Sequence, residues 1–225
     1  MQIISIKASL VDSLECSGKM PTLLHTQNAC GKDEPLSREK TIMEIKWPDS
    51  SDDSLGPILF DNHTIRKRVL ELGASITQDY HGRTPHLICI LKGASIFHAD
   101  LVRSIDLVLS FDFIAVASYG KRTKSSGEVR ILKDLDESIE GKDVLLVEDI
   151  VDTGLTLHYL LQNLKNRSPK TLKTVALLNK PSRREIDVPV EYIGFDIRND
   201  FVVGYGLDLG QRFRNLPDIY VLQNS

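Results

Sequence analysis

Hydrophobic and polar positions follow two different patterns along the chain, starting near Ile58. Apolar residues three and four positions apart predict a helix from Thr64 to about Tyr80, which Asp61 can cap. The apolar positions of this helix are Ile65, Val69, Leu72 and Ile76. Short runs that are apolar at every position predict strands buried on both faces, which is typical of a parallel sheet.

Strands and helices alternate in this pattern. Strands are expected at residues 86–91, 111–118, 144–147, 175–178 and 192–195, and further helices at 94–104 and 155–164. Such alternation predicts an α/β domain with a doubly wound, mostly parallel sheet. Residues 201–223 read as strand and loop. We expect a small hood there, built from the C-terminal and N-terminal ends of the domain, over the carboxyl edge of the sheet.

The first part of the chain has no sustained period. Residues 1–54 mix Ser, Asp, Gly and Pro, which predicts a disordered N-terminal extension before a domain at 55–225. A targeting segment is the alternative, because acidic residues are sparse up to Gly31. Basic residues are equally sparse there, so an Arg-rich transit signal is not supported.

The bulk properties are ordinary for a globular protein. The 225 residues carry a formal net charge of −3, which gives no reason to expect a nucleic-acid partner. No apolar run approaches the roughly 18 residues of a membrane span. The three cysteines form no CxxC motif, so they indicate neither a disulfide framework nor a zinc site. Cys89 lies in an apolar run and is predicted to be a buried thiol, in keeping with a cytoplasmic protein.

The most informative segment is residues 144–156. Four branched aliphatics lead to two adjacent carboxylates, Glu148 and Asp149, and Asp152 follows before Thr-Gly-Leu-Thr opens a helix. In an open α/β sheet, ligands bind at this edge, and free amides at a helix start suit phosphate. A cap at Asp152 is the simpler alternative, but a cap explains one acid and not three. The pattern therefore predicts a site for phosphate and a hard cation such as Mg²⁺, and no P-loop or dinucleotide fingerprint competes with it.

This segment resembles the phosphoribosyl-pyrophosphate signature of type I phosphoribosyltransferases. From Ile58 to about Gln223, the chain is similar to the hypoxanthine-guanine branch of that family in its bacterial-like form, with the motifs in the same order. The resemblance implies the type I fold, an Mg²⁺-dependent transfer, and a homodimer or homotetramer. Leu155 stands where some relatives carry lysine, although bacterial-type members also have an aliphatic residue there.

The resemblance implies which residues bind phosphoribosyl pyrophosphate. They are Lys92, Gly93, Ser118, Tyr119, Glu148, Asp149, Thr153, Gly154, Leu155, Thr156 and Arg214. In the family a cis peptide bond joins the residues at Leu91 and Lys92. A mobile lid follows Ser118 and Tyr119 and extends to about Arg130. On composition alone, Lys92 reads more simply as a strand-end lysine in water, and the lid as a solvated loop.

The resemblance also implies a purine-binding group of Lys180, Phe201, Val202 and Asp208. Lys180 would donate to O6 of the base, which disfavours adenine because its amino group is also a donor. Phe201 would stack on the ring, and Val202 would bind its edge through the main chain. The metal ligands would be Glu148, Asp149 and Asp208. The alternatives are a surface lysine and a β-hairpin with a core phenylalanine and a capping aspartate.

Asp152 is the expected catalytic base, which takes the N7 proton while N9 of a 6-oxopurine attacks C1′. Arg183 and Arg184 are interpreted as solvated charges. Hypoxanthine, guanine and xanthine remain open as substrates. Two other classes compete: a nucleic-acid-binding regulator that senses nucleotides, and a catalytically idle homologue. The second would have lost one of the acids Glu148, Asp149, Asp152 or Asp208, and all are present.

Overall fold

The structure is a computed structural model that describes residues 55–119 and 128–223. The expected extension at residues 1–54 and residues 120–127 of the expected lid lie outside this description. Side chains are described for neither Ser118 nor Tyr119. None of the described helices is both long and apolar enough to span a bilayer.

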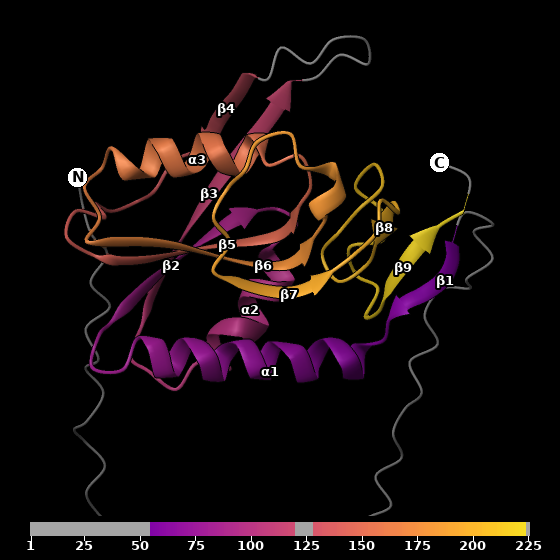
Figure 1. Ribbon diagram of the computed structural model, residues 1–225, viewed down its shortest axis with the longest axis horizontal. Coiled ribbons are helices and arrows are strands. Elements are labelled where there is room, and N and C mark those ends of the chain that lie inside the picture. Colours follow the sequence, from indigo (N-terminus) through magenta and orange to yellow (C-terminus); the bar gives the residue numbers. More distant parts are fainter. Residues whose placement is uncertain (1–54, 120–127, 224–225) are drawn as a thin grey trace, which may run out of the picture. The chain divides into compact units, whose positions relative to one another are not determined.

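The described residues form one six-stranded sheet with helices on both faces (Figure 1). Its strand order is β4-β3-β2-β5-β6-β7, and every pair is parallel except β3 with β4. The strands are β2 (Pro85–Leu91), β3 (Ser110–Tyr119), β4 (Glu128–Lys133), β5 (Asp143–Val151), β6 (Thr171–Asn179) and β7 (Tyr192–Asp196). The helices are α1 (Asn62–Asp79), α2 (Ser95–Val102) and α3 (Leu155–Lys165). The doubly wound α/β prediction is therefore confirmed.

Two hydrophobic clusters hold the helices to the sheet. α1 and α2 pack on one face through a cluster that includes Ile65, Phe97 and Leu145. α3 packs on the opposite face through Leu157 and Leu160 against Leu146. The alternating side chains of β5 therefore supply both clusters, which explains why this strand is apolar on both faces.

Local signals placed most elements within a few residues of their observed bounds. The side chain of Asp61 accepts a hydrogen bond from the backbone N–H of Thr64 at 2.7 Å, so the predicted cap of α1 is confirmed. Cys89 is a fully buried free thiol, as expected, and burial raises its pKa to about 12. β5 is longer than predicted and includes Glu148 and Asp149. β4 was not predicted, because its first residues, up to Arg130, were assigned to the polar lid.

A second, three-stranded sheet forms the hood. Its antiparallel order is β1-β9-β8, with β1 at Leu55–Phe60, β8 at Val202–Val203 and β9 at Ile219–Leu222. The hood thus joins both ends of the domain, as expected. β1 was also missed by the sequence analysis, because its pairing with β9 is made about 160 residues away along the chain.

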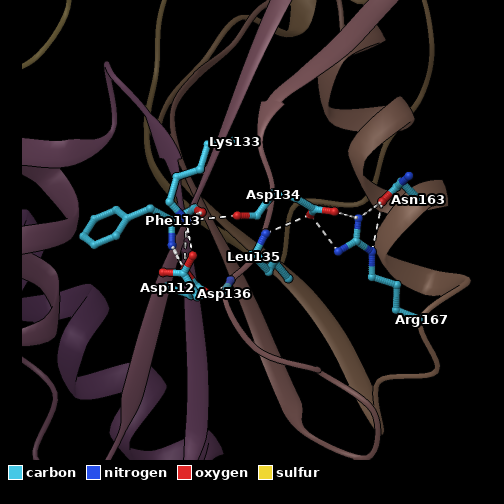
Figure 2. Close-up of polar contacts among 8 residues, drawn as sticks. All are labelled: Asp112, Phe113, Lys133, Asp134, Leu135, Asp136, Asn163 and Arg167. Carbon is cyan, nitrogen blue, oxygen red and sulfur yellow. Dashed lines mark hydrogen bonds and ion pairs between the residues drawn. The ribbon is translucent and has the colours of Figure 1, made fainter. Parts of the chain in front are cut away.

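A polar network ties β3, the segment after β4, and α3 together (Figure 2). Asp112 is 6% exposed and accepts hydrogen bonds from the backbone N–H groups of Phe113 and Asp136, at 2.6 and 2.7 Å. Lys133 Nζ lies 3.5 Å from the same carboxylate. Burial alone would raise the pKa of Asp112, but these hydrogen bonds and the lysine charge outweigh it and lower that pKa. The carboxylate is therefore held charged and fully partnered.

Candidate active site

The carboxyl ends of β2, β5 and β6 meet at one edge of the sheet. β5 pairs in parallel with both neighbours, with Cys89 beside Val147 and Val151 beside Asn179. Lys92 therefore follows β2, the acidic residues end β5, and Lys180 follows β6 at the same edge. The peptide bond between Leu91 and Lys92 is cis, as the resemblance implied.

The two acids within β5 are held in an unfavourable environment. Glu148 is partly buried and its Oε2 is enclosed without a hydrogen-bond partner among the described residues. Burial, with the neighbouring Asp149 charge, raises the pKa of Glu148 well above its usual range. Burial also raises the pKa of Asp149 to about 6, although backbone N–H groups and Arg214 act the other way. Two neighbouring carboxyls whose pKa values are raised by burial indicate a place where a positive group binds.

Asp149 also lies directly against the loop after β2. A methyl group added at Gly93 would overlap the Asp149 carboxylate, so a larger residue here would displace that carboxylate. The predicted pyrophosphate loop and the predicted metal ligand are therefore in contact. This contact joins two motifs that lie more than 50 residues apart in the sequence.

The loop between β5 and α3 leaves backbone donors unpaired. In the described residues, the N–H groups of Thr153, Gly154, Thr156 and Leu157 have no hydrogen-bond partner, and Leu155 N–H reaches only Thr153 Oγ1, at 3.4 Å. These groups lie at the start of α3, where the helix dipole also favours an anion. The segment predicted to bind phosphate therefore has the donors for it.

Asp152 does not cap α3, so that alternative is wrong. The N-cap of α3 is Gly154, with φ +87°, and it makes no side-chain hydrogen bond. The side chain of Asp152 lies among cations instead, with Arg183 Nε at 3.2 Å from Oδ1 and Lys180 Nζ at 3.8 Å from Oδ2. Arg184 Nη1 donates to the Asp152 carbonyl at 2.7 Å. The interpretation as solvated charges is therefore wrong for Arg184, which is partly buried, while Arg183 is exposed as expected but also pairs with Asp152.

A cavity of about 230 Å³ opens beside these acids. It is lined by Asp149, Ile150, Asp152, Lys180, Phe201, Val202, Leu207 and Asp208. Six of the eight were predicted as site residues, and the cavity brings β5, the loop after β6 and the hood together. Ile150 and Leu207 were missed. Each directly follows or precedes a predicted acid in the sequence, but an apolar wall gives no chemical signal of its own.

Two of the simpler alternatives fail on exposure. Lys180 is 6% exposed, so it is not a surface lysine. Phe201 is 43% exposed and lines the cavity, so it is not a core residue. Both side chains therefore line the cavity, Lys180 as a buried ammonium and Phe201 as an exposed ring.

The remaining polar residues of the hood form a connected group. Arg214 Nη2 lies 2.6 Å from Asp208 Oδ1, and the backbone N–H of Gln211 donates to Asp208 Oδ2 at 2.7 Å. Asp208 therefore does cap a turn, as the alternative held, in addition to pairing with Arg214. Lys92 Nζ donates to Gln211 Oε1 at 3.2 Å, which brings the exposed lysine to the same place. Arg214 Nε is buried and has no partner among the described residues.

Comparison with known proteins identifies the family. The phosphoribosyl transferase domain model matches residues 58–209. A hypoxanthine-guanine phosphoribosyltransferase from Bacillus subtilis (strain 168) is 51% identical over 166 residues, which cover 74% of this chain and 92% of that protein. One from Mycobacterium avium is 52% identical over 171 residues, which cover 73% of this chain and 84% of that protein.

Solved structures give the same result. A hypoxanthine phosphoribosyltransferase from Staphylococcus aureus is 46% identical with a TM-score of 0.73, covering 76% of this chain and 93% of that one. A hypoxanthine phosphoribosyl transferase from Trypanosoma cruzi is 42% identical with a TM-score of 0.72, covering 78% and 95%. The chain therefore belongs to the phosphoribosyl transferase family, in its hypoxanthine-guanine branch.

A further relative bears on the N-terminal segment. The bifunctional protein TilS/HprT of Listeria monocytogenes serotype 4b (strain F2365) is 43% identical over 197 residues, which cover 85% of this chain and 30% of that protein. Residues 55–225 make up only about three quarters of this chain. The sequence similarity to that protein therefore extends into residues 1–54.

Proposed function

We propose that the protein transfers the 5-phosphoribosyl group from phosphoribosyl pyrophosphate to N9 of hypoxanthine or guanine, in purine salvage. The cavity carries this proposal. It is lined by a buried cation, an exposed aromatic ring and three carboxylates, next to a loop with free backbone donors. A 6-oxopurine has a flat ring and an acceptor at position 6. Phosphoribosyl pyrophosphate has a 5′-phosphate and a charged leaving group.

The described acids fit an Mg²⁺ ion that is coordinated jointly by the protein and the substrate, rather than one enclosed by protein side chains alone. No group of three His, Cys, Asp or Glu side chains gathers in the described residues, so the protein alone does not form a complete cage. Magnesium commonly takes one or two carboxylates and completes its shell with water and substrate phosphates. Those one or two carboxylates are proposed to come from Glu148, whose Oε2 is unpartnered, Asp149 and Asp208. When bound, the ion would neutralise charge on the departing pyrophosphate.

The residues of the chain divide the reaction between them. Thr153, Gly154, Leu155 and Thr156 hold the 5′-phosphate, while Lys92, Gly93 and Arg214 receive pyrophosphate, and Ser118 and Tyr119 close over it. N9 attacks C1′ as the bond from C1′ to the pyrophosphate oxygen breaks. Asp152 accepts the proton from N7 as general base, and Glu148 and Asp149 place negative charge near the developing cation at C1′. Most of the acceleration comes from holding both reactants in the reacting geometry.

The choice of base depends on Lys180. Its ammonium is a donor without acceptor capacity, so it suits O6 of an oxopurine and not the amino group of adenine. Phe201 stacks on the ring and Val202 binds its edge through main-chain groups. Hypoxanthine, guanine and xanthine all carry an oxygen at position 6, so Lys180 does not distinguish them. Hypoxanthine and guanine are proposed as substrates because the chain belongs to the hypoxanthine-guanine branch.

The experiment is a Mg²⁺-dependent assay with phosphoribosyl pyrophosphate against hypoxanthine, guanine, xanthine, adenine and uracil, following pyrophosphate release. We expect turnover with hypoxanthine or guanine and none with adenine. Binding of phosphoribosyl pyrophosphate without turnover of any base would overturn the proposal in favour of a sensor or an idle homologue. A salt-dependent RNA-binding titration would then separate those two.

The proposal extends to the setting of the enzyme, its assembly and its domain boundary. We propose a cytoplasmic protein, supported by the free thiol at Cys89. A homodimer or homotetramer is the assembly that the family resemblance implies, and sedimentation of the purified chain tests it. The domain boundary near residue 55 is likewise a proposal. Limited proteolysis tests it, and a stable fragment beginning near residue 55 is the expected product.

A further inference from the structure

We propose that Arg184 is a positioning residue that shapes the phosphate-binding loop from outside the active site. The proposal rests on the proposed function only for the identity of the ligand. Arg184 lies in residues 183–186, a segment that packs against the loop of residues 152–154. This segment of residues 183–186 is the strap. The strap makes four hydrogen bonds to that loop, three of them to its backbone carbonyls.

The strap orients the loop backbone. Arg184 Nη1 donates to the carbonyl of Asp152 at 2.7 Å. The backbone N–H groups of Glu185 and Ile186 both donate to the carbonyl of Thr153, at 2.9 and 3.2 Å. Two consecutive carbonyls of the loop therefore point toward the strap.

This orientation decides where the amides point. In a planar trans peptide, the C=O and N–H of one unit point in opposite directions. The carbonyls of Asp152 and Thr153 share peptide units with the N–H groups of Thr153 and Gly154. Those two N–H groups therefore face away from the strap, and both are without a partner among the described residues. The strap thus presents the donors that the 5′-phosphate requires.

Arg184 connects the loop to the rigid sheet. Its Nη2 donates to Oδ1 of Asn179, the last residue of β6. Asn179 is 7% exposed, and its Nδ2 donates to Asp196 Oδ1 on β7 at 2.7 Å. One planar guanidinium therefore bridges the end of β6 to the Asp152 carbonyl, and this fork geometry is particular to arginine.

The strap lies so close that the loop needs glycine. A Cβ added at Gly154 would come within 2.5 Å of the Ile186 carbonyl oxygen and 3.2 Å of the Arg184 Cδ. With φ at +87°, Gly154 also has a backbone conformation that other residues rarely adopt. The strap also holds the side chain of Asp152, through Arg183. The same element therefore positions both the phosphate donors and the proposed base.

The chain offers a matched control at the other end of α3. Arg167 also bridges two segments, with hydrogen bonds to both carboxylate oxygens of Asp134 at 2.7 and 3.1 Å and to Asn163 (Figure 2). It lies outside the site, so its loss removes a comparable arginine bridge without altering the phosphate loop. Any change seen in Arg184 variants but not in an Arg167 variant belongs to positioning and not to stability.

The test measures ribose 5-phosphate binding by calorimetry, and steady-state kinetics, in the full-length chain as wild type, Arg184→Met, Arg184→Lys and Arg167→Met. We expect Arg184→Met to weaken ribose 5-phosphate binding about 10- to 100-fold and to raise the KM for phosphoribosyl pyrophosphate similarly. The KM for the purine should change less than about twofold, because the base is bound by other segments. Arg184→Lys should lie between wild type and Arg184→Met, since one donor is retained.

Arg167→Met should lower the thermal midpoint while its binding and both KM values stay within about twofold of wild type. The proposal fails if Arg184→Met binds ribose 5-phosphate like wild type, or if Arg167→Met loses as much affinity. If Arg184→Met does not fold, Arg184→Lys decides, and wild-type affinity in that variant overturns the proposal. A wild-type chain that binds ribose 5-phosphate but turns over no base would refute the proposed function alone, because the binding comparison needs no chemistry.

Discussion

Carboxylates on two strands of the same sheet differ in their hydrogen-bond partners, and their pKa values shift in opposite directions. Asp112 on β3 is almost fully enclosed, yet its oxygens accept two backbone N–H bonds and lie beside Lys133, so its pKa falls (Figure 2). Glu148 and Asp149 on β5 are partly buried, Glu148 Oε2 has no partner, and both pKa values rise. Asp112 therefore stabilises the fold, while Glu148 and Asp149 are suited to bind a positively charged ligand.

The comparison predicts that the two groups separate activity from stability. Substitutions at the carboxyl edge should cost activity and leave the fold intact or more stable. Substitutions in the network around Asp112 should cost stability and leave the kinetic constants of the folded protein unchanged.

The largest effect is expected for Asp152→Asn. Removing the proposed base while keeping its shape should lower kcat about 10²- to 10⁴-fold and spare substrate binding. The measurement is pyrophosphate release under saturating substrates, with Asp134→Asn as the control acid outside the site. Retained activity in Asp152→Asn would refute the assignment of the base.

The next effect is expected for Lys180→Met. Loss of the buried donor should lower kcat/KM for hypoxanthine about 10- to 100-fold, the range for a hydrogen bond to a charged group. The KM for phosphoribosyl pyrophosphate should change little, because other segments bind it. Equal losses for both substrates would instead show that Lys180 acts on the fold of the site as a whole.

Asp112→Asn should destabilise the fold by about 1–3 kcal/mol and leave kcat unchanged, because two backbone donors lose a charged acceptor. The effect depends on pH. The folded pKa of Asp112 is lowered, so its contribution is present above the unfolded value of about 3.9 and is lost as the pH falls through the folded pKa. Denaturant melts should therefore differ most between wild type and variant near pH 7 and converge as the pH falls through the lowered folded pKa of Asp112. A constant difference at all pH values would contradict the role given to this carboxylate.

The smallest effect, and the opposite in sign, is expected for Glu148→Gln. Burial raises the pKa of Glu148 well above its usual range, and such a carboxyl costs folding free energy at pH 7, so the neutral amide should raise stability by about 0.5–2 kcal/mol while activity falls. Thermal melts without ligand, beside the kinetic assay, measure both. A lower midpoint in Glu148→Gln would show that the carboxylate is satisfied in the free protein.

The strand and helix patterns, the Asp61 cap and the acidic run ending β5 were all predictable from the sequence, because each depends on residues close together in the chain. β4 and β1 were not predictable in this way. β4 pairs with the end of β3 across residues 120–127, and β1 is held by β9 from the far end of the domain. Edge strands of this kind gain their stability from a partner strand and not from their own apolar content.

From the sequence, three acids within five residues and an opening Thr-Gly-Leu-Thr predict a site for phosphate and Mg²⁺, because these residue types at this spacing suit both. The oxopurine and the role of Lys180 came from the resemblance to the family. Tertiary structure decided how those residues are held. Burial at the carboxyl end of β5 raises the pKa values of Glu148 and Asp149. Gly93 leaves space for the Asp149 carboxylate, and Ile150 and Leu207 line the cavity. Arg183 and Arg184, which were interpreted from the sequence as solvated charges, both contact Asp152 in the folded protein. Burial, close approach and a bridging guanidinium all depend on segments brought together only by folding, and no local pattern of residues encodes them.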